Sequence, residues 1–256
     1  MPLLEVKEMT HFFGGLRAVH NYNLAIEPGE VRGLIGPNGA GKTTIFNLIT
    51  GIHRPTEGEI LLGGRNLVGL FPHQIAAQGL GRTFQNLQLW RHMSVIEHVR
   101  MARYSKIGYG LAGAFFGTPK RHREEEEIEQ KAIALLRMMK VDHLADQNVL
   151  NLPYGAQRRV EMARALAIEP KILFLDEPTA GMNPEELKQM MDIIRQVREE
   201  IGLAIFLIEH RLKMVMELCE YIQTLVFGEV IAEGTPREIQ NNPKVIDAYL
   251  GKEAVE

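Results

Sequence analysis

The pattern of hydrophobic and polar positions changes twice along the chain. In the first part, strand-type runs such as LLEV (3–6) and NYNLAI (21–26) precede a Pro28-Gly29 turn. The run EVRGLIG (30–36) then leads through glycine-rich sequence into TTIFNLIT (43–50). This order predicts a strand, a loop and a helix in succession.

Helical spacing replaces the strand pattern from about Leu87 to Leu150. One apolar face in this part has the spacing of an α-helix and comprises Ile128, Ala132, Leu135, Leu136 and Met139. Thr118 and Pro119 suit the N-cap and first position of that helix. We therefore expect a mainly helical segment in the middle of the chain.

Strand-type runs return after the helical segment and alternate with helices. KILFLD (171–176) and LAIFLIEH (203–210) flank a predicted helix whose apolar face comprises Leu187, Met190, Met191, Ile194 and Val197. Such alternation predicts a mainly parallel sheet covered on both faces. Near the end, YIQTLVF and VIAEG around Gly228 predict a hairpin, and Thr235 and Glu238 have capping-box spacing for a last helix.

Composition narrows the classes of function. Of 256 residues, 45% are hydrophobic and 24% are charged, which is typical of a folded protein with a sizeable core. A net charge of -3 and a pI near 6.3 argue against a broad nucleic-acid surface. Cys219 is the only cysteine, so an internal disulfide and a cysteine-rich zinc site are excluded. No run of 18 or more apolar residues occurs, and we expect no membrane span.

The sequence GPNGAGKTT (36–44) has the phosphate-loop spacing of a glycine, four residues, and then glycine, lysine and threonine. Because it follows a predicted strand and precedes a predicted helix, a glycine turn without a ligand is the weaker interpretation. Backbone N–H groups of such a loop surround phosphates, Lys42 can neutralise their charge, and Thr43 can offer its hydroxyl to Mg²⁺. The predicted nucleotide contacts are Gly36, Pro37, Asn38, Gly39, Ala40, Gly41, Lys42, Thr43 and Thr44.

The run ILFLDEP (172–178) is an apolar strand that ends in two carboxylates. Asp176 is suited to hold Mg²⁺, directly or through water, and Glu177 to orient and polarise an attacking water. An acidic loop without a catalytic role is the alternative, which the upstream phosphate loop disfavours. A phosphate-loop kinase needs no carboxylate for water, so Glu177 favours hydrolysis over transfer to another substrate.

Five elements together resemble the nucleotide-binding subunit of an ATP-binding cassette (ABC) transporter, and the resemblance covers nearly all of the chain. They are the phosphate loop, the acidic strand, Gln85 in RTFQN, the segment Leu152 to Ala156 before QRRVEMARAL, and His210 in FLIEH. Their order and spacing match the family. The resemblance implies ATP and Mg²⁺ as cofactors, and hydrolysis of ATP to ADP and phosphate.

The resemblance also implies roles for the remaining site residues. Gln85 would reach Mg²⁺ and the attacking water, and its loop would sense the membrane subunit. His210, at the end of a strand, would hydrogen-bond the γ-phosphate, with a purely structural histidine as the alternative. Phe13 would stack on adenine; Phe12 is the competing candidate, and a core position is the alternative for either ring.

The segment Leu152 to Ala156, here called the signature segment, departs from the family pattern. In the family, this helix start points at the γ-phosphate of ATP bound to the other subunit, so that two subunits enclose two nucleotides. The usual Leu-Ser-Gly-Gly-Gln is here Leu152-Pro153-Tyr154-Gly155-Ala156, and Tyr154, Gly155 and Ala156 are the expected nucleotide contacts. Pro153 lacks the serine hydroxyl and a backbone donor, although its φ suits a first helical turn. A hydrogen bond to a charged group contributes about 1.5–3 kcal/mol, so we expect a site weakened roughly 10- to 100-fold unless Tyr154 or water compensates.

The fold that the resemblance implies is α/β. It is a phosphate-loop NTPase (RecA-like) core with a mainly parallel sheet, an N-terminal antiparallel β subdomain and an inserted α-helical subdomain. We expect residues 1–86 to form the nucleotide-binding core with its antiparallel part and phosphate loop, and residues 87–158 the helical subdomain with the signature segment. Residues 159–230 would complete the core, and residues 231–256 would form a C-terminal helical extension.

Further stretches resemble the larger ATPase subunit of branched-chain amino acid importers. They are GLGRTFQNLQLWRHMSVIEHV (79–99), the insertion through FFGTPKRHREEEE (115–127), LPYG (152–155) and EGTPREIQNNPKVIDAYLG (233–251). Importers of this type combine two different ATPase subunits, two transmembrane permease subunits and an external solute-binding protein. We expect a similar ATPase as partner, or a second copy of this chain, at the cytoplasmic face of the cell membrane, and no nucleic-acid partner.

A docking surface for the membrane subunit is expected just after the loop that contains Gln85 (RTFQN, 82–86), here called the glutamine loop. The segment Leu87 to Arg103 would receive a cytoplasmic helix through residues such as Trp90, Arg91 and Glu97, and surface residues without a partner are the alternative. The run IGYGLAGAFFG (107–117) is too short to span a bilayer. It is a loop near the membrane subunits, a mobile insertion, or a buried helical packing segment.

Alternative functions remain open at this point. Related ABC systems for urea or lipopolysaccharide share much of the pattern. A regulatory subunit that hydrolyses ATP weakly would suit Pro153 and Asn183, where the family usually has aspartate, whereas Glu177 and His210 argue against it. Cassette ATPases of DNA repair or translation carry a long coiled-coil insertion or two fused cassettes, and this chain has neither. A phosphate-loop kinase or GTPase is disfavoured by the segment before RRVEMARAL.

Overall fold

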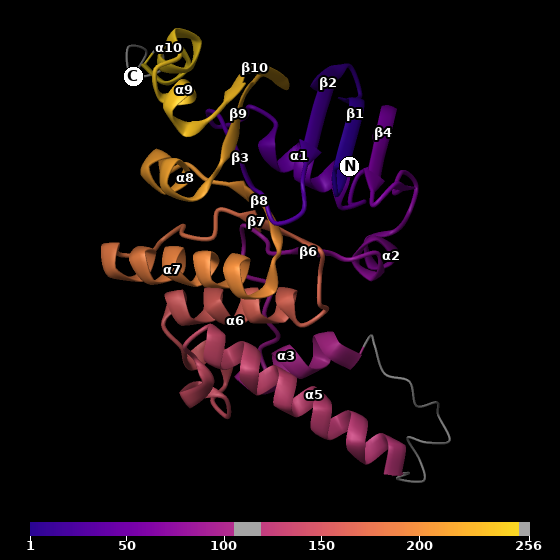
Figure 1. Cartoon of the computed structure of the whole chain (residues 1–256), viewed down its shortest axis with the longest axis vertical. Helices are drawn as coiled ribbons and strands as arrows, with labels where there is room; N and C mark the ends of the chain where they lie inside the picture. Colours follow the sequence, from indigo (N-terminus) through magenta and orange to yellow (C-terminus); the bar gives the residue numbers. More distant parts are fainter. Residues whose placement is uncertain (105–118, 251–256) are drawn as a thin grey trace.

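Two β-sheets organise the chain in the computed structural model, which describes residues 1–104 and 119–250 (Figure 1). The antiparallel sheet has the strand order β2-β1-β4-β5 and comprises β1 (Leu4–Phe13), β2 (Leu16–Ile26), β4 (Glu57–Leu62) and β5 (Arg65–Asn66). The main sheet has the order β10-β9-β3-β8-β7-β6. It comprises β3 (Val31–Ile35), β6 (Leu80–Arg82), β7 (Ile172–Asp176), β8 (Ala204–Ile208), β9 (Tyr221–Val226) and β10 (Glu229–Gly234). All neighbours in the main sheet are parallel except β9 and β10, which form the predicted hairpin.

The central strands are buried on both faces, as their unbroken apolar runs predict. Alternate side chains of β8 point to opposite faces of the sheet: Phe206 belongs to the core on the side of the antiparallel sheet, and Leu207 to the core on the other side. In β7, Phe174 and Leu175 divide in the same way. Strands β7 and β8 therefore have no free face, and the one charged residue in them, Asp176, lies at the end of β7.

Helices cover both faces of the main sheet (Figure 1). Their bounds are α1 (Lys42–Ile49), α2 (Pro72–Ala77), α3 (Val95–Arg103), α5 (Pro119–Met138), α6 (Tyr154–Leu166), α7 (Pro184–Ile201), α8 (Leu212–Leu218), α9 (Pro236–Gln240) and α10 (Pro243–Leu250). Helix α1 lies between the two sheets, where Phe46 packs on Phe174 and Phe206 with ring centroids 4.7 and 4.9 Å apart. Helices α6, α7 and α8 cover the other face, and α3 and α5 lie beyond α6.

The predicted fold class is confirmed, and so are several local signals. Helix α5 begins at Pro119, and the Glu238 carboxylate accepts a 2.7 Å hydrogen bond from the Thr235 N–H in the predicted capping box. Within residues 1–104 and 119–250, no helix is long and apolar enough to cross a membrane. The run IGYGLAGAFFG (107–117) lies outside these ranges. The predicted division between residues 158 and 159 falls inside α6, and the domain boundaries stay a prediction.

Candidate nucleotide site

The phosphate loop connects β3 to α1. Gly36 has φ of 151° and Gly41 has φ of 104°, and a Cβ atom on Gly36 would lie only 2.1 Å from the Leu225 carbonyl oxygen. Only glycine fits both the backbone conformation and the space at that position. Lys42 is 6% exposed, and its Nζ donates to the carbonyl oxygens of Gly36 and Pro37 at 2.7 and 3.0 Å. The lysine ammonium is thus held over the concave side of the loop.

A cavity of about 510 Å³ lies against the phosphate loop and brings most of the predicted site residues together. Its lining includes Asn38, Gly39, Ala40, Gly41, Lys42, Thr43 and Thr44 from the loop and the start of α1, and Phe13, Gln85, Glu177 and His210 from four other segments. Gly36, Pro37, Asp176 and the segment Tyr154 to Ala156 do not line it. The volume falls in the range of small-molecule and cofactor sites.

Of the three predicted catalytic side chains, Glu177 is hydrogen-bonded to each of the other two. Glu177 Oε1 lies 2.6 Å from His210 Nε2, and Glu177 Oε2 accepts from Gln85 Nε2 at 3.2 Å. Glu177 has φ of 49°, a conformation that non-glycine residues seldom adopt and that is common at functional sites. Its carboxylate therefore lies between the glutamine loop and the end of β8, beside the phosphate loop.

A buried acid that the sequence did not single out holds these loops in place. Glu209 is 3% exposed, and its Oε1 accepts from both the N–H and the hydroxyl of Thr179, two residues after Glu177. Its Oε2 accepts from the His210 N–H at 3.1 Å. Glu209 thereby fixes the loop of Glu177 relative to His210. The run FLIEH gives no local signal for this role, because the partner Thr179 is 30 residues away.

The residues at the end of β7 fit a magnesium ion. Asp176 is 1% exposed, and burial raises the pKa of its carboxyl, against the opposing attraction of Arg82. Its Oδ2 accepts from Arg82 Nη2 at 3.1 Å, whereas its buried Oδ1 has no hydrogen-bond partner in the described part of the chain. Mg²⁺ characteristically takes one or two protein oxygens and completes its shell with phosphates and water. The Asp176 Oδ1 and the Thr43 hydroxyl are the oxygens that would hold it, and the expected contact of Gln85 with the ion stays a prediction.

The lining of the cavity favours Phe13 over Phe12 as the ring predicted to contact a base. Phe13 lines the cavity, and its ring makes edge contacts with the rings of His11 and His53, with centroids 4.6 and 5.3 Å apart. Burial lowers the pKa of His11, and the nearby charge of His53 lowers it further. Phe12 does not line the cavity. Stacking of adenine on Phe13 stays a prediction.

Four lining residues were missed in the sequence: Leu16, Arg17, Ala18 and Phe227. Phe227 is 83% exposed, in the turn between β9 and β10, and Arg17 forms a 2.7 Å ion pair with Glu229 across the same region. The hairpin pattern around Gly228 predicted the turn. Nothing in that pattern showed that the turn borders the phosphate loop, since the two are far apart in sequence.

The signature segment starts a helix but differs from the expectation for Pro153. Pro153 is the N-cap of α6 and not a residue of its first turn. Its carbonyl oxygen accepts from the N–H groups of Ala156 and Gln157 at 3.0 and 3.1 Å. The N–H groups of Tyr154 and Gly155 occupy the first two helical positions, which have no acceptor within any α-helix. The proline therefore leaves these two donors in place.

Arg158 ties the signature helix to the glutamine loop. This side chain is 2% exposed and donates to the carbonyl oxygens of Phe84, at 2.6 Å, and of Gln85. It also donates to the Tyr154 hydroxyl at 2.7 and 3.0 Å and pairs with Glu161 at 3.1 Å. Burial raises the pKa of Glu161, and the nearby Arg158 opposes the shift. The segment predicted to face the other subunit is thus connected to Gln85 in the same chain.

Asn183, the second departure from the family pattern, caps helix α7. Its Oδ1 accepts from the N–H groups of Glu185 and Glu186 at 3.0 Å each, and its own N–H donates to Glu186 Oε2 at 3.1 Å. Asparagine and aspartate are equally good N-caps, so this local role does not need the charge. Communication between two sites through this position stays untested.

Comparisons with known proteins agree with this geometry. The family model described as ABC transporter matches residues 19–180, and that described as branched-chain amino acid ATP-binding cassette transporter matches residues 229–255. The chain is 45% identical to the high-affinity branched-chain amino acid transport ATP-binding protein LivG of Escherichia coli, and 42% identical to BraF of Pseudomonas aeruginosa, which has the same description. Each comparison covers 98% of both chains.

Solved structures show the same fold. A crystal structure of the ADP conformation of an ATP-binding cassette of an ABC transporter is 30% identical, with a TM-score of 0.85 over 98% of this chain and 99% of that one. A dimeric structure of a bacterial ABC transporter cassette is 27% identical, with a TM-score of 0.78 over 91% of this chain and 99% of that one.

The position of Lys42 leads to a first prediction. Lys42→Ala should weaken nucleotide binding by about 10- to 100-fold, because the substitution removes a charge-assisted contact to the phosphates. Isothermal titration of the purified chain with ATP would measure the effect. The exposed Lys188 of α7 offers a matched control, and Lys188→Ala should bind as the wild type does. Equal affinities of Lys42→Ala and the wild type would contradict the phosphate-loop assignment.

Proposed function

The chain belongs to the ATP-binding cassette transporter family, whose members hydrolyse ATP to power transport, and from this premise we propose that it drives import of branched-chain amino acids. The observation that carries the proposal is the family match of residues 229–255 together with 45% identity to LivG over nearly the whole chain. Cassettes of the family act as dimers with membrane permease components. As a member, the chain binds ATP and associates peripherally with a membrane through those components.

The proposed division of labour in hydrolysis follows the geometry of the cavity. The backbone of Asn38 to Thr44 and the Lys42 ammonium hold the phosphates, and Phe13 stacks on the base. Mg²⁺, when bound, neutralises charge on the phosphates. Glu177 then orients the attacking water and accepts its proton, while Gln85 and His210 hold Glu177 in place. The hydrogen-bonded set of Glu177, Gln85 and His210 supports full hydrolysis over the regulatory alternative.

The proposed partners are a second, similar ATPase subunit or another copy of this chain, two transmembrane permease subunits, and, beyond the membrane, a solute-binding protein. The cytoplasmic face of the cell membrane is the proposed location. In this assembly Tyr154, Gly155 and Ala156 contact the γ-phosphate held by the other ATPase subunit. The first N–H groups of α6, which have no acceptor within the helix, and the positive end of its dipole suit an anion there.

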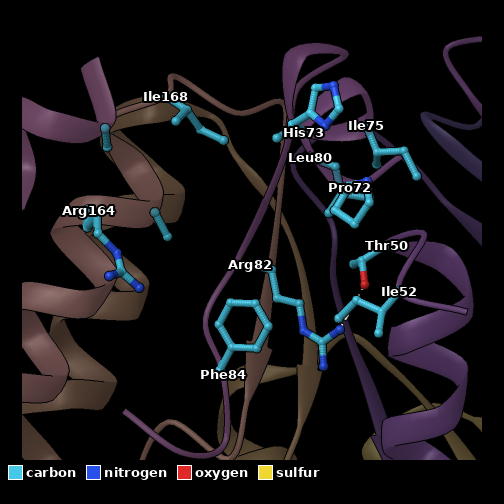
Figure 2. Close-up of a pocket in the computed structure, with 13 residues that line it drawn as sticks. Thr50, Ile52, Pro72, His73, Ile75, Leu80, Arg82, Phe84, Arg164 and Ile168 are labelled. Carbon is cyan, nitrogen blue, oxygen red and sulfur yellow. Dashed lines mark hydrogen bonds between the residues drawn. The ribbon is translucent and has the colours of Figure 1, made fainter. Parts of the chain in front are cut away.

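We further propose that the permease docks in a groove, here named the docking groove, beside the glutamine loop. The groove has a volume of about 350 Å³ and is lined mainly by apolar side chains of α2, α6 and the segments around them (Figure 2). Figure 2 shows Pro72, His73 and Ile75 on one side and Ile168 with Arg164 on the other. A short amphipathic helix of the permease is the occupant that such a groove fits.

The docking groove modifies the expectation for residues 87–103. Only Ala102 of that segment lines it, and the glutamine-loop residue Phe84 lines it as well. The Glu97 carboxylate accepts from the Ser94 N–H at 2.7 Å and so caps α3. Trp90 is 48% exposed, and the guanidinium of Arg164 lies 5.2 Å from its ring centroid. Trp90 and Arg91, which is exposed, remain proposed contacts at the rim.

Glu177→Gln tests the proposed hydrolysis. Glutamine keeps the shape of the side chain but cannot accept a proton, so turnover in the assembled transporter should fall by about 10²- to 10⁴-fold. ATP binding should persist and favour a closed dimer, measurable by gel filtration with ATP. Glu199→Gln, on the exposed side of α7, is the matched control. Wild-type turnover by Glu177→Gln would exclude the general-base role.

Pro153→Ser tests whether the missing hydroxyl limits the rate. Serine at the N-cap restores a hydroxyl beside the two backbone donors, so hydrolysis by the assembled transporter should rise by several-fold, up to about tenfold. Pro243→Ser, at the start of α10, is the control for loss of a proline at a helix start. An unchanged rate in Pro153→Ser would mean that the N–H groups of Tyr154 and Gly155 already suffice.

Ala76→Arg tests the docking groove. A charge placed among apolar lining residues is buried without a partner when the permease helix enters, so the affinity for permease subunits in detergent should fall at least about tenfold. Ala25→Arg, on an exposed position of β2, is the matched control and should associate normally. Titration of the purified chain with ATP would show that both variants retain the nucleotide site. Normal association of Ala76→Arg would rule out this groove as the docking surface.

A further inference from the structure

Arg82, the last residue of β6, is a buried arginine that the proposed hydrolysis does not use. Its side chain is 7% exposed, and its Nη2 lies 3.1 Å from Oδ2 of Asp176. Its Nη1 donates to Asn47 Oδ1 and to Thr50 Oγ1, at 2.8 Å in each case. Both acceptors belong to α1 or its C-cap, and α1 begins in the phosphate loop. One guanidinium thus connects the end of β7 to the helix that carries the phosphate loop.

Two aromatic rings restrict the orientation of this guanidinium. The Arg82 Cζ lies 5.6 Å from the ring centroid of Phe46 and 5.0 Å from that of Phe84. Figure 2 shows Arg82 beside Phe84, with its guanidinium directed toward Thr50. Phe46 is fully buried, so it cannot move without disturbing the aromatic packing of α1 on the sheet. The position of the guanidinium is therefore restricted by these two rings as well as by its polar contacts.

The carboxylate of Asp176 is satisfied on one oxygen only. Arg82 binds Oδ2, whereas the buried Oδ1 has no hydrogen-bond partner among residues 1–104 and 119–250. A buried carboxylate oxygen without a partner is unfavourable, because it has lost its hydration without a replacement. The same atom is a hard oxygen ligand of the kind that Mg²⁺ prefers. The two oxygens thus have different roles.

We propose that Arg82 is a positioning residue for the magnesium site, which holds Oδ2 of Asp176 so that Oδ1 is directed to the metal. The proposal rests on the proposed function, because it takes Asp176 as the residue that holds Mg²⁺. Arg82 does not contact the nucleotide in this role. Because Arg82 already orients the Asp176 carboxylate, less free energy is needed to orient it when the metal binds.

Arg82 should therefore affect binding of the nucleotide only when Mg²⁺ is present. The magnesium ratio, defined as the dissociation constant of a non-hydrolysable ATP analogue in EDTA divided by that in excess Mg²⁺, isolates this contribution. Calorimetry on the purified full chain measures it without hydrolysis. A residue that merely supports the fold or the phosphate loop would change both dissociation constants equally and leave the ratio unaltered.

Arg82→Gln removes the charge and keeps a polar amide, but its shorter side chain loses the Nη contacts to Asp176, Asn47 and Thr50. We expect its magnesium ratio to fall about 10- to 100-fold, with the dissociation constant in EDTA close to that of the wild type. Arg82→Lys keeps the charge but cannot make the forked set of contacts, and its ratio should fall by a smaller factor of roughly five. Arg65→Met, at an exposed arginine of β5, is the control and should leave the ratio unchanged.

Each outcome decides the proposal. A magnesium ratio of Arg82→Gln equal to that of the wild type would overturn it, and so would an equal loss of affinity in EDTA and in Mg²⁺. If thermal unfolding shows that Arg82→Gln is not folded, Arg82→Lys decides alone: a reduced ratio supports the proposal and a wild-type ratio overturns it. Failure of the wild type to bind the nucleotide in either buffer would refute the proposed function, and this inference with it.

Discussion

Burial of the central strands on both faces is the constraint on which the site depends. Strands β7 and β8 are buried along their whole length, and their one charged residue, Asp176, lies where β7 ends. In a parallel sheet, the carboxyl ends of neighbouring strands meet at the same edge. Asp176 ends β7 and Glu177 follows it, Glu209 with His210 follow β8, and the phosphate loop follows β3. The candidate catalytic groups come together because these strand ends lie side by side at one edge of the sheet.

Anchoring groups then determine how precisely the converging segments are held. Glu209 binds the loop of Glu177 and the backbone of His210, and Arg158 binds the backbone of the glutamine loop. Both side chains are almost fully buried, so their hydrogen bonds are protected from water and loss of one partner would leave a charge unpaired. The loops that carry Glu177, His210 and Gln85 are therefore fixed to elements of the core, although each is itself outside a helix or strand.

The sequence was most informative where the signal is local. The phosphate loop, the apolar runs of β7 and β8, the hairpin at Gly228 and the capping box at Thr235 are each contained in a few consecutive residues, and their spacing alone predicts them. The anchors could not be predicted in this way. Arg82 is 94 residues from Asp176, and Arg158 is 74 residues from Phe84. From sequence alone, a charged residue in a strand or helix is predicted to be exposed to solvent, because its distant partner is not known.

The position of Pro153 illustrates the same limit. Compared with the family pattern, the proline reads as the loss of a donor, but at the N-cap of α6 it leaves the N–H groups of Tyr154 and Gly155 in place. Tyr154, which replaces a glycine of that pattern, supplies the hydroxyl that accepts from Arg158. The same guanidinium holds the carbonyl oxygens of Phe84 and Gln85. A displacement of the first turn of α6 therefore has to move the glutamine loop or break these hydrogen bonds. Pro153 and Tyr154, the two departures in this turn, thus affect the same connection between α6 and the glutamine loop.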